Sequence, residues 1–163
     1  MYAQSVPFLI KNLEATIKFM KKAEAAIEAH KMDKSVVLNL RIFPDMLPLL
    51  RQITLVSDFA KGAGARLGGV AIPSFADEEK TFEELYARLS KTVEFLKSID
   101  PKGFEGAESR HVTLKQGGKD VSMSGQDYFS GYALPNLFFH MTTAYNILRG
   151  IGVELGKADF MGR

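Results

Sequence analysis

His140 is the side chain of this sequence with the widest chemical capability, because it is an imidazole set within an apolar helical stripe. The stripe belongs to a predicted helix at about 135–151, in which Leu137, Ala144 and Leu148 recur on the same side. An imidazole with its ordinary pKa of about 6.5 can act as an acid or a base, and it can bind a metal ion. A buried polar group without a partner costs about 1 to 3 kcal/mol, so we expect a hydrogen-bond partner for His140 whatever its function.

Other polar side chains could share a pocket with this histidine. Gln52 lies at the edge of the inner stripe of another predicted helix, and Tyr145 follows His140 in the same helix. We take His140, Gln52 and Tyr145 as the candidate pocket. Three further tyrosines could reach the same cavity: Tyr86, Tyr128 and Tyr132. No serine nucleophile motif accompanies the histidine, so the catalytic residues stay unassigned. Two interpretations of His140 are open, a packed core histidine and the remains of a functional pocket.

The elements that would position these residues follow from hydrophobic periodicity. Apolar residues recur at helical spacing in four segments, at about 3–30, 45–67, 77–98 and 135–151. Alternating residues on either side of QGGK predict a small β-hairpin at about 110–124. The pattern therefore predicts an all-α protein, a four-helix bundle with a hairpin inserted before its last helix.

Turn and capping residues delimit these segments. Asp45 can accept from the free N–H groups of the second helix, and Ser74 or Asp77 can do so for the third. The glycines at 68 and 69 are expected to end the second helix.

Two long connections permit a crossover topology, at residues 31–44 and 100–133. No linker or internal repeat interrupts the chain, so residues 1–163 are predicted to form a single domain.

The composition excludes several classes of protein. Hydrophobic residues make up 46% of the chain and charged residues 25%, which is typical of a folded globular domain. The formal charge is only +2, which gives no concentrated cationic face for nucleic acid. There is no cysteine, which excludes thiolate nucleophiles, thiolate metal ligands and disulfides.

No apolar run approaches the roughly 20 residues that a membrane span requires, so no membrane partner is expected. The first residues lack a basic region followed by an apolar one, which predicts a cytoplasmic protein.

Four sequence blocks together resemble an uncharacterised family of the DinB/YfiT-like superfamily. They are RIFPDMLPLLRQ, DFAKGAGARLGG, IPSFADEEKTFEELYARL and LPNLFFHMTTAYNILRGIGVELGKADFMG. The resemblance covers nearly the whole chain and implies a bacterial four-helix bundle that is often a homodimer. It also implies a divalent metal held between helices by three histidines, which serves thiol-dependent transferases and isomerases in some members.

The implied metal site transfers poorly onto this sequence. His140 matches the first of two histidines spaced four apart in the last helix, but Ala144 occupies the second position. In the second helix, where the superfamily has another histidine, the nearest inward polar residue is Gln52. Catalytic zinc characteristically has three protein ligands. The residues therefore predict a degenerate site, with no bound metal and no cofactor.

Three functions stay open. The first is a bundle that binds a small molecule near His140. The second is a divalent-metal-dependent transferase or hydrolase with a reduced site around the same residue. The third is a structural or interaction protein that acts as a homodimer.

Overall fold

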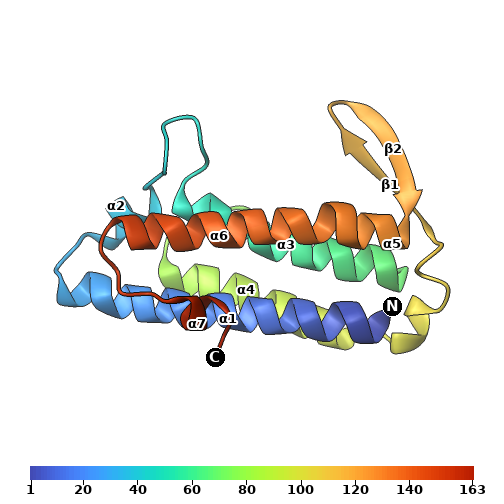
Figure 1. The fold of residues 1–163 in the computed structure, drawn as a ribbon, viewed down its shortest axis with the longest axis horizontal. Helices are drawn as coiled ribbons and strands as arrows, with labels where there is room; N and C mark the ends of the chain where they lie inside the picture. The colour runs from blue at the N-terminus through green and yellow to red at the C-terminus, as the bar shows by residue number, and fades with distance from the viewer.

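Four long helices form the body of the molecule: α1 (Tyr2–Ala29), α3 (Leu49–Gly68), α4 (Phe82–Ser98) and α6 (Leu134–Gly150). The computed structural model describes all 163 residues. α1 and α6 run in one direction and α3 and α4 in the other (Figure 1). α3 packs against both α4 and α6, and α1 packs against α4. The predicted all-α four-helix bundle is confirmed.

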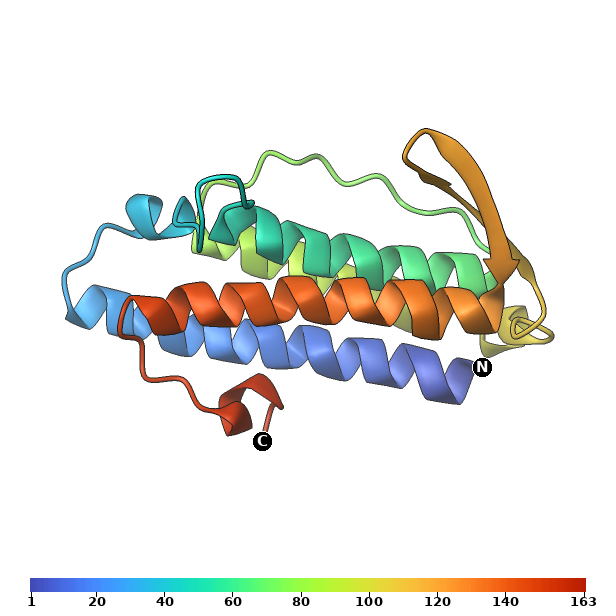
Figure 2. The same ribbon diagram turned by 45° about the horizontal axis from the view of Figure 1, so that its top comes forward.

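A crossover connection joins α3 to α4. Because these two helices run parallel, residues 69–81 have to return along the length of the bundle before α4 begins (Figure 2). The longer connections at 31–44 and 100–133 do not make the crossing. The first contains the short helix α2 (Lys34–Leu38), and the second carries the hairpin. We call residues 69–81 the strap.

The predicted start of the third helix, at about 77, is wrong. α4 begins at Phe82, because Thr81 and Glu84 form a reciprocal capping box, in which the side chain of each residue accepts a hydrogen bond from the backbone N–H of the other. Ser74 and Asp77 do not cap this helix and belong to the strap.

The predicted start of the second helix, at about 45, is also wrong. α3 begins at Leu49, because Pro48 disfavours the helical conformation in Leu47. Asp45 therefore lies in a turn and caps no helix. The helix ends as expected at Gly68, where Gly69 adopts a left-handed conformation with φ of 67°.

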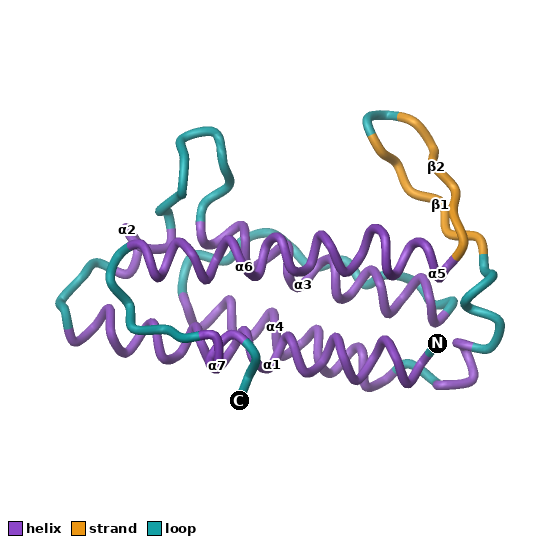
Figure 3. The backbone as a smooth tube through the Cα atoms, viewed as in Figure 1, coloured by secondary structure: helices purple, strands orange, loops and turns teal.

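The hairpin consists of β1 (His111–Gln116) and β2 (Lys119–Ser124), which pair antiparallel. Gly117 and Gly118 both have positive φ, as a two-residue type I′ turn requires. The strands project from one end of the bundle (Figure 3). On β1 only Val112 and Leu114 are buried, so the alternation reflects one face packed on the bundle.

Arg110 joins the base of the hairpin to the end of α3. Its guanidinium donates to the carbonyl oxygens of Leu67 at 2.5 Å and Gly103 at 2.9 Å. The carbonyls in the last turn of a helix have no partner within the helix, so this side chain satisfies one of them and holds β1 beside α3.

Short helices complete the chain. They are η1 (Pro101–Phe104), α5 (Gly125–Asp127), η2 (Tyr128–Ala133) and α7 (Lys157–Phe160). α5, η2 and α6 follow one another without a break, and η2 is a π-helical stretch. α7 packs on α1, where Lys22 forms an ion pair with Asp159 at 2.9 Å. None of the helices combines the length and the apolar character that a membrane span requires.

Candidate functional site

His140 and Gln52 face each other across the α3–α6 interface. Nδ1 of His140 lies 2.7 Å from Oε1 of Gln52, which is the hydrogen-bond partner expected for a buried imidazole. The amide nitrogen of Gln52 donates to the carbonyl oxygen of Leu47 at 2.9 Å. Because that bond turns the amide oxygen toward the ring, and an amide oxygen only accepts, Nδ1 carries the proton. In the neutral ring Nε2 is therefore the nitrogen with the free lone pair.

Aromatic rings enclose the imidazole. The ring of Phe59 stacks on it with a centroid distance of 5.4 Å, and Phe139 meets it edge-on at 5.2 Å. Only 8% of His140 is exposed. Burial lowers its pKa below the ordinary value, because the charged form loses hydration. The histidine is therefore neutral near pH 7.

The residues around His140 do not fit a divalent metal. Ala144, one turn further along α6, is buried and has no donor atom. Gln52 directs its amide oxygen at the histidine itself, so that atom is not free for an ion. Nowhere in the chain do three histidine, aspartate or glutamate side chains gather in a way that could hold a metal ion. The donor set is short of the three protein ligands that a catalytic zinc site uses.

Tyr145, the third predicted pocket residue, is engaged elsewhere. Its hydroxyl donates to the carbonyl oxygen of Leu155 at 3.0 Å, and its ring meets Phe160 of α7 edge-on at 5.8 Å. The structure thus brings His140 and Gln52 together and directs Tyr145 toward the C-terminal segment. Tyr86 is also occupied, because its hydroxyl donates to Glu24 at 2.8 Å.

A cleft opens beside the histidine, between the hairpin and the bundle. Its volume is about 450 Å³, which is within the range of small-molecule sites. α3 contributes one side of the cleft, β1 another and η2 a third. The lining residues are Leu55, Asp58, Phe59, Arg66, Thr113, Leu114, Lys115, Tyr128 and Tyr132. We call it the hairpin cleft.

A row of aromatic rings links the hairpin cleft to His140. Phe59 stacks on the imidazole and meets Tyr132 edge-on at 6.0 Å, and Tyr132 stacks on Tyr128 at 5.9 Å. Phe59 and Tyr132 are only half-buried, so their rings are available as walls of the cleft. His140 therefore packs against the aromatic wall of the cleft without lining the cleft itself.

Arg66 lies at one end of this row. Its Nη1 donates to the hydroxyl of Tyr128 at 3.2 Å, and its guanidinium lies 5.6 Å from the centre of that ring. Burial raises the pKa of Tyr128, and the charge of Arg66 opposes the rise only in part, so the phenol keeps its proton. Arg66 has no carboxylate partner, although a guanidinium carries five N–H groups.

Local sequence explains how these side chains come to meet. A Cβ at Gly62 would lie 2.5 Å from Nη1 of Arg66, so only glycine leaves room for the guanidinium at this position. The π-helical stretch Tyr128–Ala133 holds an extra residue per turn, which changes the facing of Tyr128 relative to α6. Such insertions in α-helices are frequent at functional sites.

The other end of the cleft is held by charge pairs. Asp58 accepts from Lys61 at 2.9 Å and from Arg88 at 2.8 Å, so its negative charge is matched by two cations. Asp58 and Arg66 are eight residues apart on α3, a separation of about 12 Å along the axis.

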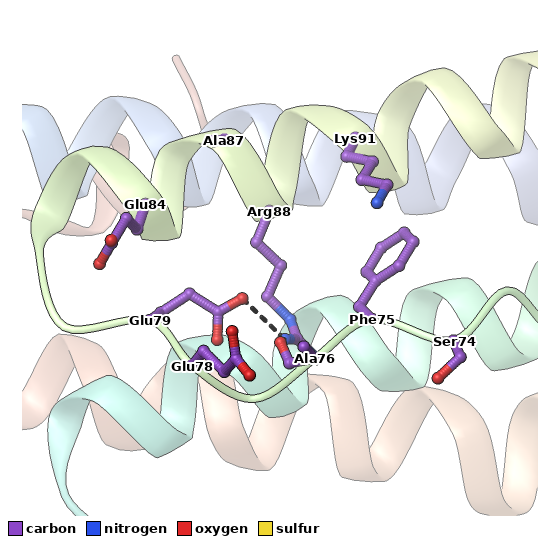
Figure 4. A pocket seen from close by; sticks show the side chains of 9 residues that line it. All are labelled: Ser74, Phe75, Ala76, Glu78, Glu79, Glu84, Ala87, Arg88 and Lys91. Atoms are coloured by element: carbon purple, nitrogen blue, oxygen red, sulfur yellow. Dashed lines mark hydrogen bonds and ion pairs between the residues drawn. The ribbon is translucent and has the colours of Figure 1, made fainter.

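A second cavity, of about 350 Å³, lies between the strap and α4 (Figure 4). Its main feature is the buried Arg88, which donates to the carbonyl oxygen of Ala76 at 3.0 Å and to Glu79 at 2.8 Å. Phe75 is held between two lysines, with Nζ of Lys61 at 4.1 Å and Nζ of Lys91 at 4.4 Å from its ring centre. These contacts tie the strap to α3 and α4, which gives Arg88 a structural role.

Most residues of the hairpin cleft were not predicted from the sequence. Tyr128 and Tyr132 were named as tyrosines that could reach a cavity, but Arg66 lay in a glycine-rich run that lacks a phosphate-binding pattern. The usable signal is the spacing of Gly62 and Arg66, since residues four apart share a helix face.

Comparison with known structures places this architecture in a class. The crystal structure of a DinB family member protein from Shewanella denitrificans, determined at 1.83 Å resolution, matches with a TM-score of 0.90 and 36% sequence identity. The match covers 99% of this chain and 92% of that chain. The fold thus defines a DinB-like helical bundle with a small antiparallel hairpin before its last long helix.

The family within this class follows from the sequence. Residues 1–161 match the family described as Domain of unknown function (DUF1993), and the chain belongs to this family. None of the curated proteins with which the chain was compared matches it.

Proposed function

We propose that this protein binds a small molecule in the hairpin cleft. The observation that carries the proposal is a cavity of about 450 Å³ whose aromatic and polar side chains come from three separate elements. Sites for small molecules commonly combine such apolar walls with a few polar groups that fix orientation. Phe59 and Tyr132 supply the walls, and Arg66 supplies hydrogen-bond donors.

His140 has a supporting role in this proposal. It is buried and stacked on Phe59, and its Nδ1–H donates a hydrogen bond to Oε1 of Gln52. Its lone pair on Nε2 has no protein partner. Because the ring is neutral and stacked on Phe59, its role in the proposal is to hold that ring in place as a wall of the cleft. The proposal is therefore that the protein binds a ligand without strong catalysis.

A blocking substitution tests the proposal. Leu55 is half-buried on α3 and lines the cleft, so Leu55→Trp should place an indole ring in the cavity. Lys119→Trp, on the exposed part of β2 outside the lining, is the matched control. A fragment library screened by ligand-observed NMR should give binders to the wild type and to the control that Leu55→Trp no longer binds. Equal binding to all three proteins would refute the cleft as the site.

The divalent-metal enzyme is the alternative function, and His140 is the residue that could support it. Elemental analysis of protein purified without chelator, with His140→Ala as the control, distinguishes the metal enzyme from a protein that binds its ligand without metal. Metal near one equivalent in the wild type and absent from the variant would favour the enzyme.

The homodimer is a further proposal, supported by apolar side chains on the projecting loop 39–48. Ile42, Phe43 and Leu47 are all exposed there. Light scattering at high concentration would show a dimer, and Phe43→Ser should weaken it.

A further inference from the structure

We propose that the ligand of the hairpin cleft is a small aromatic anion, such as an aryl carboxylate, and that Arg66 holds its acidic group. This inference rests on the proposed function and specifies the class of ligand. It follows from three features of the cleft: its unmatched positive charge, its aromatic wall and the place of the charge relative to that wall.

The positive charges that line the cleft lack full counter-charges, whereas its negative charge is paired. Arg66 bonds only to the neutral hydroxyl of Tyr128. Lys115 is exposed, and its nearest carboxylate, that of Asp120, is 3.8 Å away on the surface, where such a pair contributes little. The one carboxylate of the lining, Asp58, is already paired with Lys61 and Arg88. An anion entering the cleft therefore meets two cations without a fully matched counter-charge.

The donor geometry suits an acid group. A guanidinium presents parallel N–H groups that match the two oxygens of a carboxylate. Gly62 leaves the space in which the guanidinium of Arg66 lies, and Tyr128 holds it at one nitrogen. The side chain is thus oriented before a ligand arrives, which reduces the entropy lost on binding.

The wall next to this donor suits a flat ring. Tyr128 lies under Arg66, and Tyr132 stacks on Tyr128 before the row continues to Phe59. Aromatic side chains prefer offset-stacked or edge-on contacts with further rings. A ligand whose acid group reaches Arg66 would therefore lay its ring against Tyr132 and Phe59.

The test compares two probes of the same shape and opposite charge, 2-naphthoate and 2-naphthylmethylamine. Each is titrated into ¹⁵N-labelled protein and followed by amide shifts. We expect naphthoate to shift amides of the cleft and to bind about tenfold or more tightly than the amine. The preference should shrink as sodium chloride is added, because exposed charges are screened.

Three variants assign the preference to Arg66. Arg66→Gln should weaken naphthoate binding about tenfold and leave the amine little changed. Gly62→Ala keeps the charge but displaces the guanidinium, and it should give a smaller loss. Lys18→Gln removes an exposed charge on α1, away from the cleft, and should have no effect. The amide spectrum of each variant also reports whether it is folded.

The outcomes separate the two proposals. If the amine binds the cleft as tightly as naphthoate, the ligand class is wrong while the cleft remains a binding site. If naphthoate binds equally well to Arg66→Gln, Arg66 does not hold the acid group. If neither these probes nor any library fragment shifts the amides of the cleft, the proposed function itself fails.

Discussion

Two glycines of α3 should respond in opposite ways to the same substitution. Alanine is favoured over glycine in a helix by about 1 kcal/mol, so both Gly62→Ala and Gly64→Ala start with this gain. A Cβ at Gly62 would lie 2.5 Å from Nη1 of Arg66, the far end of a flexible and half-exposed side chain. The guanidinium can move into solvent, so the new methyl group needs no change in the core.

Gly64 faces the opposite situation. Its added Cβ would overlap a methyl group of Leu96 and lie 3.2 Å from Ile99, and both of these side chains are buried between α3 and α4. Overpacking of this kind costs about 1 to 3 kcal/mol. Gly64→Ala should therefore destabilise the protein by up to about 2 kcal/mol.

Gly62→Ala should instead leave the free energy of unfolding unchanged or raise it by up to about 1 kcal/mol, because the lost hydrogen bond from Arg66 to Tyr128 offsets part of the gain in helix propensity. Urea unfolding measures the difference as a change in midpoint at constant slope. Each kcal/mol should also shift Tm by about 2 to 4 °C for a chain of this size. A Gly64→Ala protein at least as stable as the wild type, or a Gly62→Ala protein equally destabilised, would contradict the packing described for α3.

Other substitutions test the strap and the histidine pair. Arg88→Met should cost about 1 to 3 kcal/mol, because it leaves the carboxylate of Glu79, whose side chain is only 12% exposed, without a cation, and limited proteolysis should then cleave within 69–81. Lys97→Met, at an exposed ion pair, should cost under about 1 kcal/mol; equal losses would argue against the strap's dependence on Arg88. The pKa of His140 is lowered in the folded protein, so the unfolded chain takes up the proton more readily. The free energy of unfolding should therefore fall as the pH is lowered from about 7 to about 5. Urea unfolding at both pH values should show a smaller fall for His140→Gln, and identical falls would exclude this cause. Gln52→Glu should raise the pKa of His140 by placing a carboxylate at Nδ1, and an NMR titration of the ring proton that showed no rise would refute the contact.

The sequence predicted the elements of the fold better than their connections. The long amphipathic helices and the hairpin were identified because their apolar residues follow the period of the backbone. The strap has no such period, because it lies in extended form across a helix surface and is held by single contacts such as that of Arg88. Its role as the crossover therefore became visible only once α3 and α4 were seen to run parallel.

The candidate site divides in the same way. The sequence alone determined that His140 faces the core, that Ala144 offers no second ligand one turn later, and that Gln52 is the nearest inward polar group, because helix periodicity settles which residues share a face. Only the tertiary structure decided that Gln52 bonds to His140, that Tyr145 turns to the C-terminal segment, and that Arg66 reaches Tyr128 beneath the hairpin. These contacts join residues as many as 88 positions apart, and such distances are set by how helices pack and where a hairpin lies, which no local pattern encodes.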